Sequence, residues 1–242
     1  DPDSYEVYLS KNSSPIMDIF NGKLFHSIKC PSCGHKRVVY DPFMFLSLPI
    51  PSNNHSTTIN DYTSTSSRYG YSSYLYSNNR YTSYSSYKKV TLADCFDSFA
   101  KSEALDVHNL WKCDSCCKEV NATVKSGISK TSDILIIHLK RFDGQSYYMK
   151  KIDTPVDYPE TIDSSFFQNS MNLSASGIQN SIYPKYNLIV VVFHHGSLSG
   201  GHYTSAARDP ETNKWYEFND SSVTQIQKED AHSSNAYILF YQ

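Results

Sequence analysis

The sequence lacks the features that would place a protein in a membrane or on nucleic acid. None of its apolar runs approaches the roughly 20 residues that a membrane-spanning helix needs. The first ten residues do not have the basic-then-apolar pattern of a secretion signal. The 22 basic and 24 acidic residues nearly cancel, so no basic field exists to attract phosphate groups. We therefore expect neither a membrane nor a nucleic acid among the partners.

Apolar residues are also scarce, at 39% of the 242 residues, which indicates that part of the chain lies outside any core. The segment 52–89 is dominated by Ser, Tyr and Asn, and Asp61 is its only acidic residue. Such a segment has little apolar surface to bury, so we predict a disordered, low-complexity insertion in a surface loop. Its tyrosines leave a binding segment as the alternative. The chain begins with Asp rather than Met, which favours a processed or excised fragment.

The six cysteines include two Cys-x-x-Cys pairs, at 30–33 and 113–116. Two thiolates three residues apart in a tight turn can share a metal ion at about 2.3 Å, and two such turns complete a tetrahedron. The predicted ligands of a structural zinc ion are Cys30, Cys33, Cys113 and Cys116. Unpaired thiols or two local disulfides are the alternative, and Cys117 could replace its neighbour. Paired cysteines without a secretion signal indicate a reducing compartment, hence the cytoplasm or nucleus.

Strand signals outnumber helix signals along the chain. The strongest strand candidates are 134–139, 188–193 and 236–241, which are rich in β-branched or aromatic residues. Further strand material lies at 38–40 and 43–46, before the prolines at 49 and 51. One helix is predicted after Thr91, a suitable N-cap, because the apolar residues that follow have helical spacing. The sequence therefore predicts an α+β fold that is mainly antiparallel β.

The stretch 186–222 is the most informative for function. It has the pattern of a strand, a glycine-rich loop, a strand, a turn and a strand. His202 follows the glycines at the start of the second strand, and Asn219 and Asp220 end the third. A hairpin of this length returns both ends to one edge, so a polar side chain can bind one imidazole nitrogen and leave the other for a nucleophile. We predict a catalytic histidine with an orienting partner; a structural histidine is the alternative.

Several motifs along the chain are similar to the signature segments of one enzyme family. The histidine box is similar to His194-x-Gly196, Gly201-His202-Tyr203, Trp215-Tyr-x-Phe-Asn219-Asp220-Ser-x-Val223 and Ala236-Tyr237-x-Leu-Phe-Tyr241. A second family signature resembles Ile136-x-His138-Leu139-Lys140-Arg141-Phe142. Earlier matches are Phe20-x-Gly22, Cys30-Pro-x-Cys33, Asp41-Pro42-Phe43, Leu46-x-Leu48-Pro49 and Thr91-Leu92 through Glu103-x-Leu105. The likeness covers nearly the whole chain except 52–89. A second and less clear exception is 160–182. The family that these motifs resemble is the ubiquitin-specific proteases, which are papain-like cysteine proteases. The likeness is strongest to members with an insertion between the two zinc knuckles.

The resemblance implies roles for the residues of the histidine box. His202 would be the general base, Asn219 the residue that orients its ring, and Asp220 an acidic neighbour that assists. The substrate-binding residues would be His194, which supports a channel for the substrate's tail, with Gly200, Gly201 and Tyr203. His195 has no counterpart in the family pattern, and we expect His138 to be a packed core residue.

The resemblance also implies a hand-shaped catalytic domain of which this chain forms a part. Zinc-ribbon fingers with a flanking helix are expected at 15–50 and 91–130, interrupted by the insertion at 52–89. A palm that contains the histidine box is expected at 131–242. The family's nucleophile lies in an Asn-x-Gly-x-Thr-Cys segment, and no cysteine here has that context. We therefore expect the mainly helical thumb, which carries the nucleophile, to be missing from this chain.

The implied activity is thiol-dependent hydrolysis of isopeptide bonds at the C-terminus of ubiquitin. The partners would be ubiquitin, ubiquitinated proteins and an N-terminal Cys-bearing segment of the same enzyme. Because a thiolate is needed to form the acyl-enzyme, the chain alone is expected to be inactive. The main alternative is a non-catalytic ubiquitin-binding module with a structural zinc ribbon. A third hypothesis, a secreted tyrosine-rich adhesive protein, rests only on 52–89, and the cysteine spacing argues against it.

Overall fold

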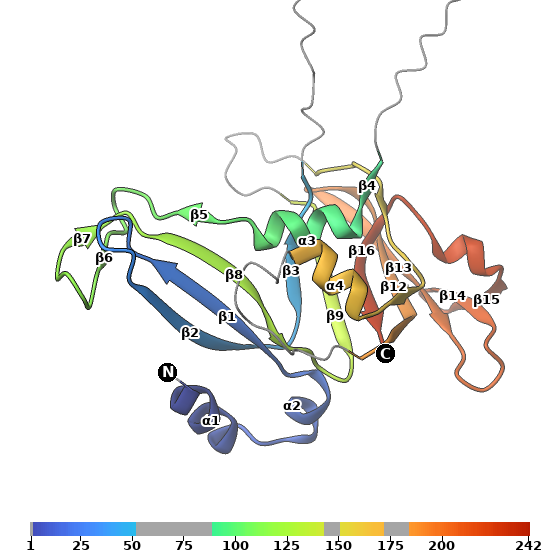
Figure 1. Cartoon of the computed structure of the whole chain (residues 1–242). Helices are drawn as coiled ribbons and strands as arrows, with labels where there is room; N and C mark the ends of the chain where they lie inside the picture. The colour runs from blue at the N-terminus through green and yellow to red at the C-terminus, as the bar shows by residue number, and fades with distance from the viewer. Residues whose placement is uncertain (1, 52–88, 143–150, 172–183) are drawn as a thin grey trace, which may run out of the picture. The chain divides into compact units, whose positions relative to one another are not determined.

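An eight-stranded sheet carries most of the C-terminal half of the chain (Figure 1). The computed structural model describes residues 2–51, 89–142, 151–171 and 184–242. The strand order is β15-β14-β13-β12-β16-β9-β3, and β11 pairs beside β12. The strands are β3 (Leu46–Pro49), β9 (Leu135–Lys140), β11 (Thr161–Ile162), β12 (Tyr186–Ser197), β13 (Gly200–Arg208), β14 (Trp215–Asn219), β15 (Ser222–Ile226) and β16 (Ala236–Tyr241). Within this sheet only β3 and β9 run parallel, so the predicted antiparallel class and its three strongest strands are confirmed.

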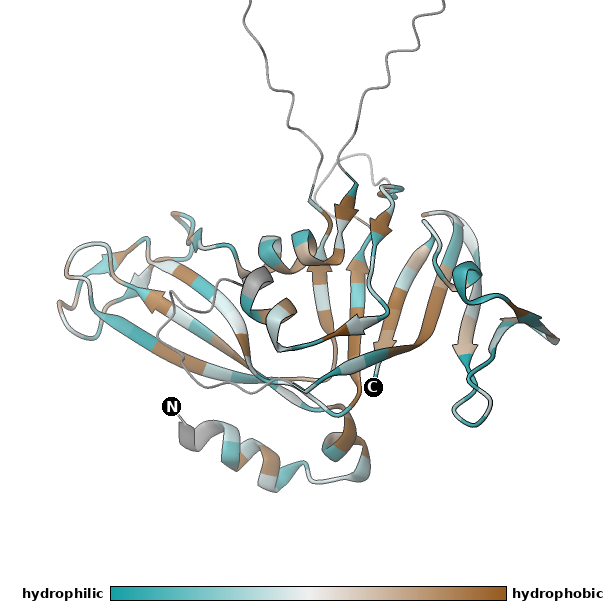
Figure 2. Ribbon diagram, turned by 45° about the vertical axis from the view of Figure 1, so that its right-hand side comes forward, coloured by the Kyte–Doolittle hydropathy of each residue, from teal (hydrophilic) through white to brown (hydrophobic). Residues whose placement is uncertain are grey.

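One face of this sheet supplies most of the core. Val191 and Phe193 of β12 are buried, as are Leu239 and Tyr241 of β16, while Val192 between the first two is only partly buried. The strands are coloured largely as hydrophobic in Figure 2. Successive side chains of a strand point to opposite faces, so this alternation separates a core face from a half-exposed face.

Helices α3 (Leu92–Ala100) and α4 (Ser164–Met171) pack against each other beside the sheet (Figure 1). The ring of Phe96 contacts Phe166 and Phe167 edge-on, at centroid distances of 5.5 and 5.8 Å. The α3 helix begins after Thr91, whose hydroxyl accepts from the amide of Asp94 at 3.2 Å while the Asp94 carboxylate accepts from the Thr91 amide at 2.8 Å. This reciprocal capping satisfies two amide groups that the helix itself leaves unpaired. The predicted helix and its N-cap are therefore confirmed.

A second sheet and a small ribbon hold the two cysteine pairs. The strand order of this sheet is β2-β1-β8-β5, with β1 (Gly22–Lys29), β2 (Lys36–Phe43), β5 (Glu103–Ala104) and β8 (Thr123–Lys130). A separate ribbon pairs β6 (Trp111–Lys112) with β7 (Glu119–Val120). Gly127 faces Phe25 across β8 and β1, and a Cβ there would lie 2.5 Å from the Phe25 ring. One cysteine turn joins β1 to β2 and the other joins β6 to β7, which brings cysteines far apart in sequence to one end of these strands.

Several short elements have no counterpart among the predictions. They are the helices α1 (Pro2–Lys11), α2 (Pro15–Phe20) and α4, the 3-10 turn η2 (Lys228–Ala231), and the parallel pair β4 (Val90–Thr91) and β10 (Val156–Asp157). A usable signal existed for α2, because Ser14 caps it by accepting from the Met17 amide at 3.2 Å and Pro15 occupies its first turn. The Ser-Pro dipeptide is typical of such a helix start.

The predicted strand at 43–46 is wrong as a single unit. The β2 strand ends at Phe43, the chain bends at Met44 and Phe45, and β3 begins at Leu46. Phe43 and Leu46 are both buried but belong to different sheets, so the chain has to turn between them. The exposed Phe45, at 58%, belongs to this bend.

The predicted insertion lies outside the described residues, apart from Lys89 at its end. Its disorder stays a prediction from composition. In the described ranges, no helix combines the length and the apolar character needed to cross a bilayer.

Candidate active site and metal centre

A turn at 209–214 brings His202 and Asn219 together. Two main-chain hydrogen bonds of 2.9 Å close this turn, as the Asp-Pro dipeptide at 209 predicts. The β14 strand then runs back along β13, with Ser205 opposite Phe218. Continued by one residue, this register places Asn219 on the same face of the sheet as His202. The start of β13 and the end of β14 therefore lie close together, as predicted. The β13 strand begins at Gly200 rather than at His202.

The His202 ring is hydrogen-bonded to the Asn219 side chain. The Nε2 atom of His202 lies 2.7 Å from Oδ1 of Asn219, and both residues are exposed. An amide oxygen can only accept, so Nε2 carries the proton and the lone pair of Nδ1 remains available. The neutral amide orients the ring without adding charge. This arrangement suits a general base that is approached from its Nδ1 side.

Asp220 does not share this hydrogen bond. It opens the two-residue turn between β14 and β15, where Asn219 pairs with Ser222. Its φ of +50° lies in the left-handed region, in which Asp is found more often than most residues. Among the described residues His202 bonds to Asn219 alone, so any assistance from Asp220 would act through its charge.

The predicted substrate-channel residues gather at the same end of the β12–β13 hairpin. His194 is only 4% exposed, and its ring packs against Tyr203 and Tyr237 at centroid distances of 4.7 and 6.0 Å. Gly201 lies against this ring, because a Cβ at this position would be 2.2 Å from Nε2 of His194. A Cβ at Gly200 would meet open space. The hairpin thus brings His194, Gly201 and Tyr203 into contact and leaves Gly200 at its open end.

The surroundings of His194 favour its neutral form. Burial lowers the pKa of the ring, and the nearby Lys151 and His195 lower this pKa further. Its Nδ1 atom is buried and has no hydrogen-bond partner among the described residues. An unpaired buried nitrogen costs free energy.

His195, which has no counterpart in the family pattern, is a neighbour of His202. The two residues face each other directly across β12 and β13. Directly opposed residues share a face of the sheet, with Cβ atoms about 4.5–5.5 Å apart. The His195 ring nitrogens lie 3.3 Å from the Thr204 hydroxyl and 3.3 Å from the Asn235 amide nitrogen. Its ring is therefore tied to groups other than Asn219.

The four predicted metal ligands form one cluster. The sulfur atoms of Cys30, Cys33, Cys113 and Cys116 all lie within 4.8 Å of one another. Cys33 and Cys113 are 3.6 Å apart, and Cys30 and Cys116 are 3.9 Å apart. Two sulfurs bound tetrahedrally at about 2.3 Å from zinc are themselves about 3.8 Å apart. The cluster can therefore hold a metal ion, and its donor set fits a tetrahedral ion with an affinity for sulfur.

Two similar turns position these cysteines. The amide of Gly34 donates to the carbonyl of Cys30 at 3.0 Å, and the amide of Cys117 donates to the carbonyl of Cys113 at 2.8 Å. An ion pair of 3.1 Å between Arg37 and Asp114 links one turn to the other. The cluster includes Cys116 and not Cys117, so the alternative in which Cys117 replaces its neighbour does not match the structure.

One protein family matches nearly the whole chain. The family model described as ubiquitin carboxyl-terminal hydrolase matches residues 3–241. The chain belongs to this family. The resemblance to ubiquitin-specific proteases inferred from the motifs is therefore confirmed.

Relatives of known name agree with this assignment. Human ubiquitin carboxyl-terminal hydrolase 2 is 32% identical over 238 residues, which cover 98% of this chain and 33% of the human protein. Ubiquitin carboxyl-terminal hydrolase 4 of Saccharomyces cerevisiae is 32% identical over 248 residues, which cover 98% of this chain and 23% of the yeast protein. This chain thus spans a third or less of the length of these two ubiquitin hydrolases.

Solved structures show the same fold. A chain of the SAGA Ubp8/Sgf11/Sus1/Sgf73 DUB module bound to ubiquitin aldehyde matches with a TM-score of 0.67 and 27% identity, over 100% of this chain and 46% of that one. The same module bound to monoubiquitin matches with a TM-score of 0.67 and 26% identity, over 98% of this chain and 45% of that one. The predicted fold class is confirmed, including a four-cysteine cluster compatible with a zinc ribbon.

Of the two remaining cysteines of this family member, Cys95 is a poor candidate for a nucleophile. Cys95 is fully buried on α3, as predicted, and burial, assisted by Asp94, raises the pKa of its thiol to about 12. Cys117 belongs to the second cysteine turn. A cysteine nucleophile reacts as the thiolate, which a raised pKa disfavours.

Two buried cations beside the histidine box were not predicted as site residues. Arg141, 1% exposed, donates to the carbonyl of Ala236 at 2.6 Å and to two carbonyls of the segment 152–154 at 2.9 Å. Lys151, 7% exposed, donates to the main chain of β12. Arg141 lies in the 136–142 signature, whereas Lys151 carries no sequence signal, because nothing in a lysine reveals that its ammonium group will be buried.

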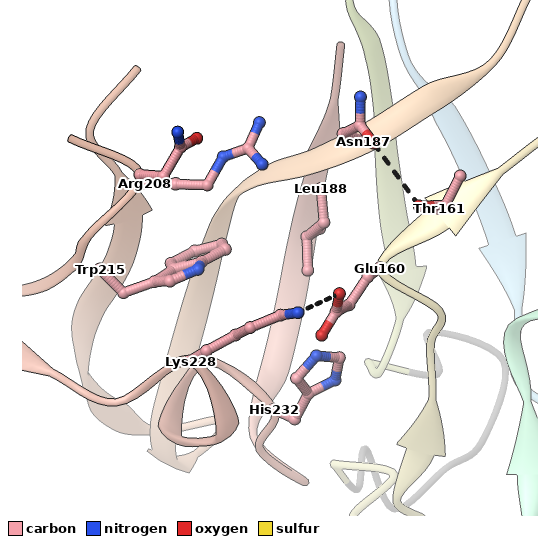
Figure 3. Close-up of a pocket in the computed structure, with 9 residues that line it drawn as sticks. Glu160, Thr161, Asn187, Leu188, Arg208, Trp215, Lys228 and His232 are labelled. Carbon is pink, nitrogen blue, oxygen red and sulfur yellow. Dashed lines mark hydrogen bonds and ion pairs between the residues drawn. The ribbon is translucent and has the colours of Figure 1, made fainter. Parts of the chain in front are cut away.

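A pocket of about 250 Å³ lies at the other end of β12, β13 and β14 (Figure 3). Its lining residues are Glu160, Thr161, Asn187, Leu188, Arg208, Asn213, Trp215, Lys228 and His232. Lys228 forms an ion pair of 2.5 Å with Glu160 at its rim. Arg208 lies six residues after His202 on β13, a separation of about 20 Å along the strand. None of the predicted site residues lines this pocket.

Proposed function

We propose that this chain carries the histidine half of the active site of a deubiquitinating cysteine protease. His202 is the general base and Asn219 orients its ring, with Asp220 as an acidic neighbour. One observation carries the proposal, the 2.7 Å hydrogen bond between His202 Nε2 and Asn219 Oδ1, which leaves Nδ1 free. Family membership supports the class of reaction, which is hydrolysis at the C-terminal carbonyl of ubiquitin.

The reaction requires a cysteine thiol, which we assign to an N-terminal Cys-bearing segment of the same enzyme. Nδ1 of His202 takes the thiol proton, and the thiolate attacks the carbonyl carbon of ubiquitin's last residue. The imidazolium then protonates the departing lysine amine of the conjugated protein, which leaves a thioester. Nδ1 next takes a proton from water, whose oxygen attacks the thioester. Release of the thiol, reprotonated by the imidazolium, yields the C-terminal carboxylic acid of ubiquitin, which ionises to the carboxylate by losing its proton to solvent.

The partners in this proposal are ubiquitin and ubiquitinated proteins. Two solved relatives are complexes with ubiquitin aldehyde and with monoubiquitin, which supports ubiquitin as the ligand. The substrate's tail is assigned to the end of the β12–β13 hairpin, where the contacts come from His194, Gly200, Gly201 and Tyr203. A tail backbone can approach closely at Gly200, which has no side chain and faces open space.

We propose one structural zinc ion for the four-cysteine cluster. The sulfur distances of 3.6 and 3.9 Å agree with tetrahedral thiolate coordination, and four sulfur ligands leave no position for a reacting water. The ion would join the turn after β1 to the turn after β6. Because thiolates must stay reduced to bind it, we place the protein in the cytoplasm or nucleus.

The test is to join the Cys-bearing segment to this chain and to measure turnover of a ubiquitin C-terminal amide. We expect His202→Ala to lower turnover by about 10²-fold or more, as removal of a general base does. Asn219→Ala should have a smaller effect and Asn219→Asp a smaller one still, because an aspartate can orient the ring. His195→Ala is the control for damage to the hairpin, since its ring is bonded to Thr204 and Asn235. Loss of activity in His195→Ala with retention in His202→Ala would refute the assignment.

A second candidate is a non-catalytic ubiquitin-binding module. It is favoured by the cysteine inventory, in which four thiols form the cluster, Cys117 borders it, and Cys95 is buried with a raised pKa. For the chain alone we expect no cleavage of a ubiquitin amide and weak binding of ubiquitin. Thiol-sensitive cleavage by the chain alone would contradict this expectation. Restored turnover after addition of the Cys-bearing segment separates the enzyme from the pure binder.

A further inference from the structure

The end of the β12–β13 hairpin that carries His202 extends past the neighbouring strands. Pairing of β16 with β12 stops at Phe193, and pairing of β14 with β13 begins only at Ser205. Residues 194–204, which we call the distal hairpin, are therefore paired only with each other. An isolated two-stranded hairpin is at best marginally stable in water. Contacts other than strand pairing must hold the distal hairpin in place.

The β13 edge of the distal hairpin is held by Asn219. Its side-chain oxygen accepts from His202 Nε2 at 2.7 Å and so ties this edge to the end of β14. The β12 edge lies on the opposite side, where β16 has ended. There the His194 amide donates to the carbonyl of Asn235 at 3.0 Å, which extends the β16 contact by one residue.

Lys151 holds the remainder of the β12 edge. Its Nζ atom lies 2.7 Å from the carbonyl oxygen of His194 and 3.2 Å from that of Gly196. Residues two apart in a strand turn their main-chain groups toward the same edge, so both carbonyls face away from β13. One ammonium group thus bonds the two carbonyls that a longer β16 would have bonded.

The buried position of Lys151 is unfavourable for a charge unless the hydrogen bonds to the two carbonyls offset the cost of burial. Its side chain is 6% exposed, and among the described residues its ion-pair partner is Asp153, whose carboxylate oxygen is 3.9 Å away on a 75% exposed side chain. Burial of an ammonium group costs free energy that a distant, solvated carboxylate offsets poorly. The two short bonds to carbonyl oxygens supply the compensation. A methionine of similar length would avoid the cost of burial but would leave both carbonyls unpaired.

The distal hairpin transmits the position of its β12 edge to the groups that act on substrate. Gly201 lies so close to the His194 ring that a Cβ there would be 2.2 Å from it, and His195 faces His202 across the strands. A shift of the His194 and Gly196 main chain would therefore move both His202 and the glycine contact. We propose that Lys151 is a positioning residue for the deubiquitinating reaction, because its ammonium group fixes the distal hairpin by bonding the carbonyls of His194 and Gly196. This inference rests on the proposed function for its catalytic consequence, while its structural part stands on the chain alone.

The catalytic consequence is tested in the chain joined to the Cys-bearing segment. Lys151→Met removes the donors at similar length, Lys151→Arg keeps charge and donors, and Lys140→Met is the control, because Lys140 is an exposed lysine on β9. We expect Lys151→Met to lower kcat by about 10-fold to 100-fold, the scale that misplacement by about 1 Å produces. The affinity for ubiquitin should change less than about threefold, because misplacement affects the chemical step more than binding. Lys151→Arg should recover part of kcat, and Lys140→Met should match the parent.

The structural consequence is tested in the chain alone by amide hydrogen exchange. We expect Lys151→Met to speed exchange in residues 194–204 by about 10-fold or more, since local opening follows local stability, while 188–193 and the four-stranded sheet stay protected. Unchanged exchange and unchanged kcat would overturn the inference. Faster exchange throughout the chain would also overturn it, because Lys151 would then support the whole fold. If the joined parent protein had no turnover, the proposed function would fail, and the exchange pattern would still decide whether Lys151 holds the hairpin.

Discussion

Gly34 and Cys117 occupy the same position in the two cysteine turns, and both have a left-handed backbone. Their φ angles are +75° and +59°. Each follows the second cysteine of its pair, and the amide of each donates back to the carbonyl of the first. Glycine adopts this conformation freely, whereas a residue with a Cβ is strained in it. The second turn therefore makes the same bend as the first with a less suitable residue.

Cys117→Gly should raise stability and leave metal binding intact. Relief of the left-handed strain, worth about 1–2 kcal/mol, is partly offset by the greater freedom of glycine in the unfolded chain, about 0.5–1 kcal/mol. We expect a net gain of about 0.5–1 kcal/mol. Gly34→Ala should lose about 1 kcal/mol by the same reasoning, because a Cβ there meets no other atom and only the backbone is strained. Denaturant unfolding measures both, and a loss of metal from Cys117→Gly would contradict the ligand assignment.

Cys113→Ser should remove the metal and much of the stability together. Purified protein is expected to hold close to one equivalent of zinc, and the variant to hold far less. The melting temperature should fall in parallel, since the free energy of binding a structural metal contributes to folding. Cys117→Ser is the matched control, because it changes the neighbouring thiol outside the cluster. A Cys113→Ser protein with full zinc content and an unchanged melting temperature would exclude this cluster as the site.

Gly201→Ala should destabilise the folded chain, whereas Gly200→Ala should not. A Cβ at position 201 would lie 2.2 Å from the His194 ring and 2.6 Å from the His195 carbonyl oxygen, so strands or rings must move. Overpacking of this kind costs about 1–3 kcal/mol. At position 200 no atom lies within 4 Å of the added carbon, and a change within about 0.5 kcal/mol is expected. Equal free energies of unfolding for the two variants would contradict the close packing at Gly201.

His194 should make the chain less stable on mild acidification. Its pKa is lowered in the folded state by burial, then by Lys151 and His195, relative to about 6.5 in the unfolded chain. Above pH 6.5 both states hold a neutral ring. Below it the unfolded chain binds a proton that the folded chain binds less readily, so the free energy of unfolding falls as pH falls from about 6.5 toward the folded pKa. His194→Gln should therefore show a shallower loss between pH 7 and 5 in urea unfolding. The cysteine cluster is the same in both proteins, so its own pH dependence cancels in the difference, and parallel curves would contradict the prediction.

Local patterns predicted those parts of the molecule that depend on near neighbours in sequence. A capping residue and the spacing of apolar residues are enough to predict the helix after Thr91. A run of β-branched and aromatic residues is enough to predict the strand at 236–241. The prediction of one strand at 43–46 is wrong because Phe43 and Leu46 are buried in different sheets, which local composition does not reveal. The helix start at Ser14 and Pro15 has a local signal and could have been predicted from it.

Motif spacing predicts the family, the two cysteine turns and the residues of the histidine box, because spacing within a turn or a hairpin restricts which side chains can meet. The tertiary structure decided what that spacing leaves open. It brought Cys30 and Cys116 to 3.9 Å across 86 positions of sequence, and it placed His195 opposite His202. It also buried the Lys151 ammonium group against β12, and burial of a charge depends on atoms from distant segments. Local sequence does not predict this burial, because the ammonium group is shielded from water only in the folded sheet.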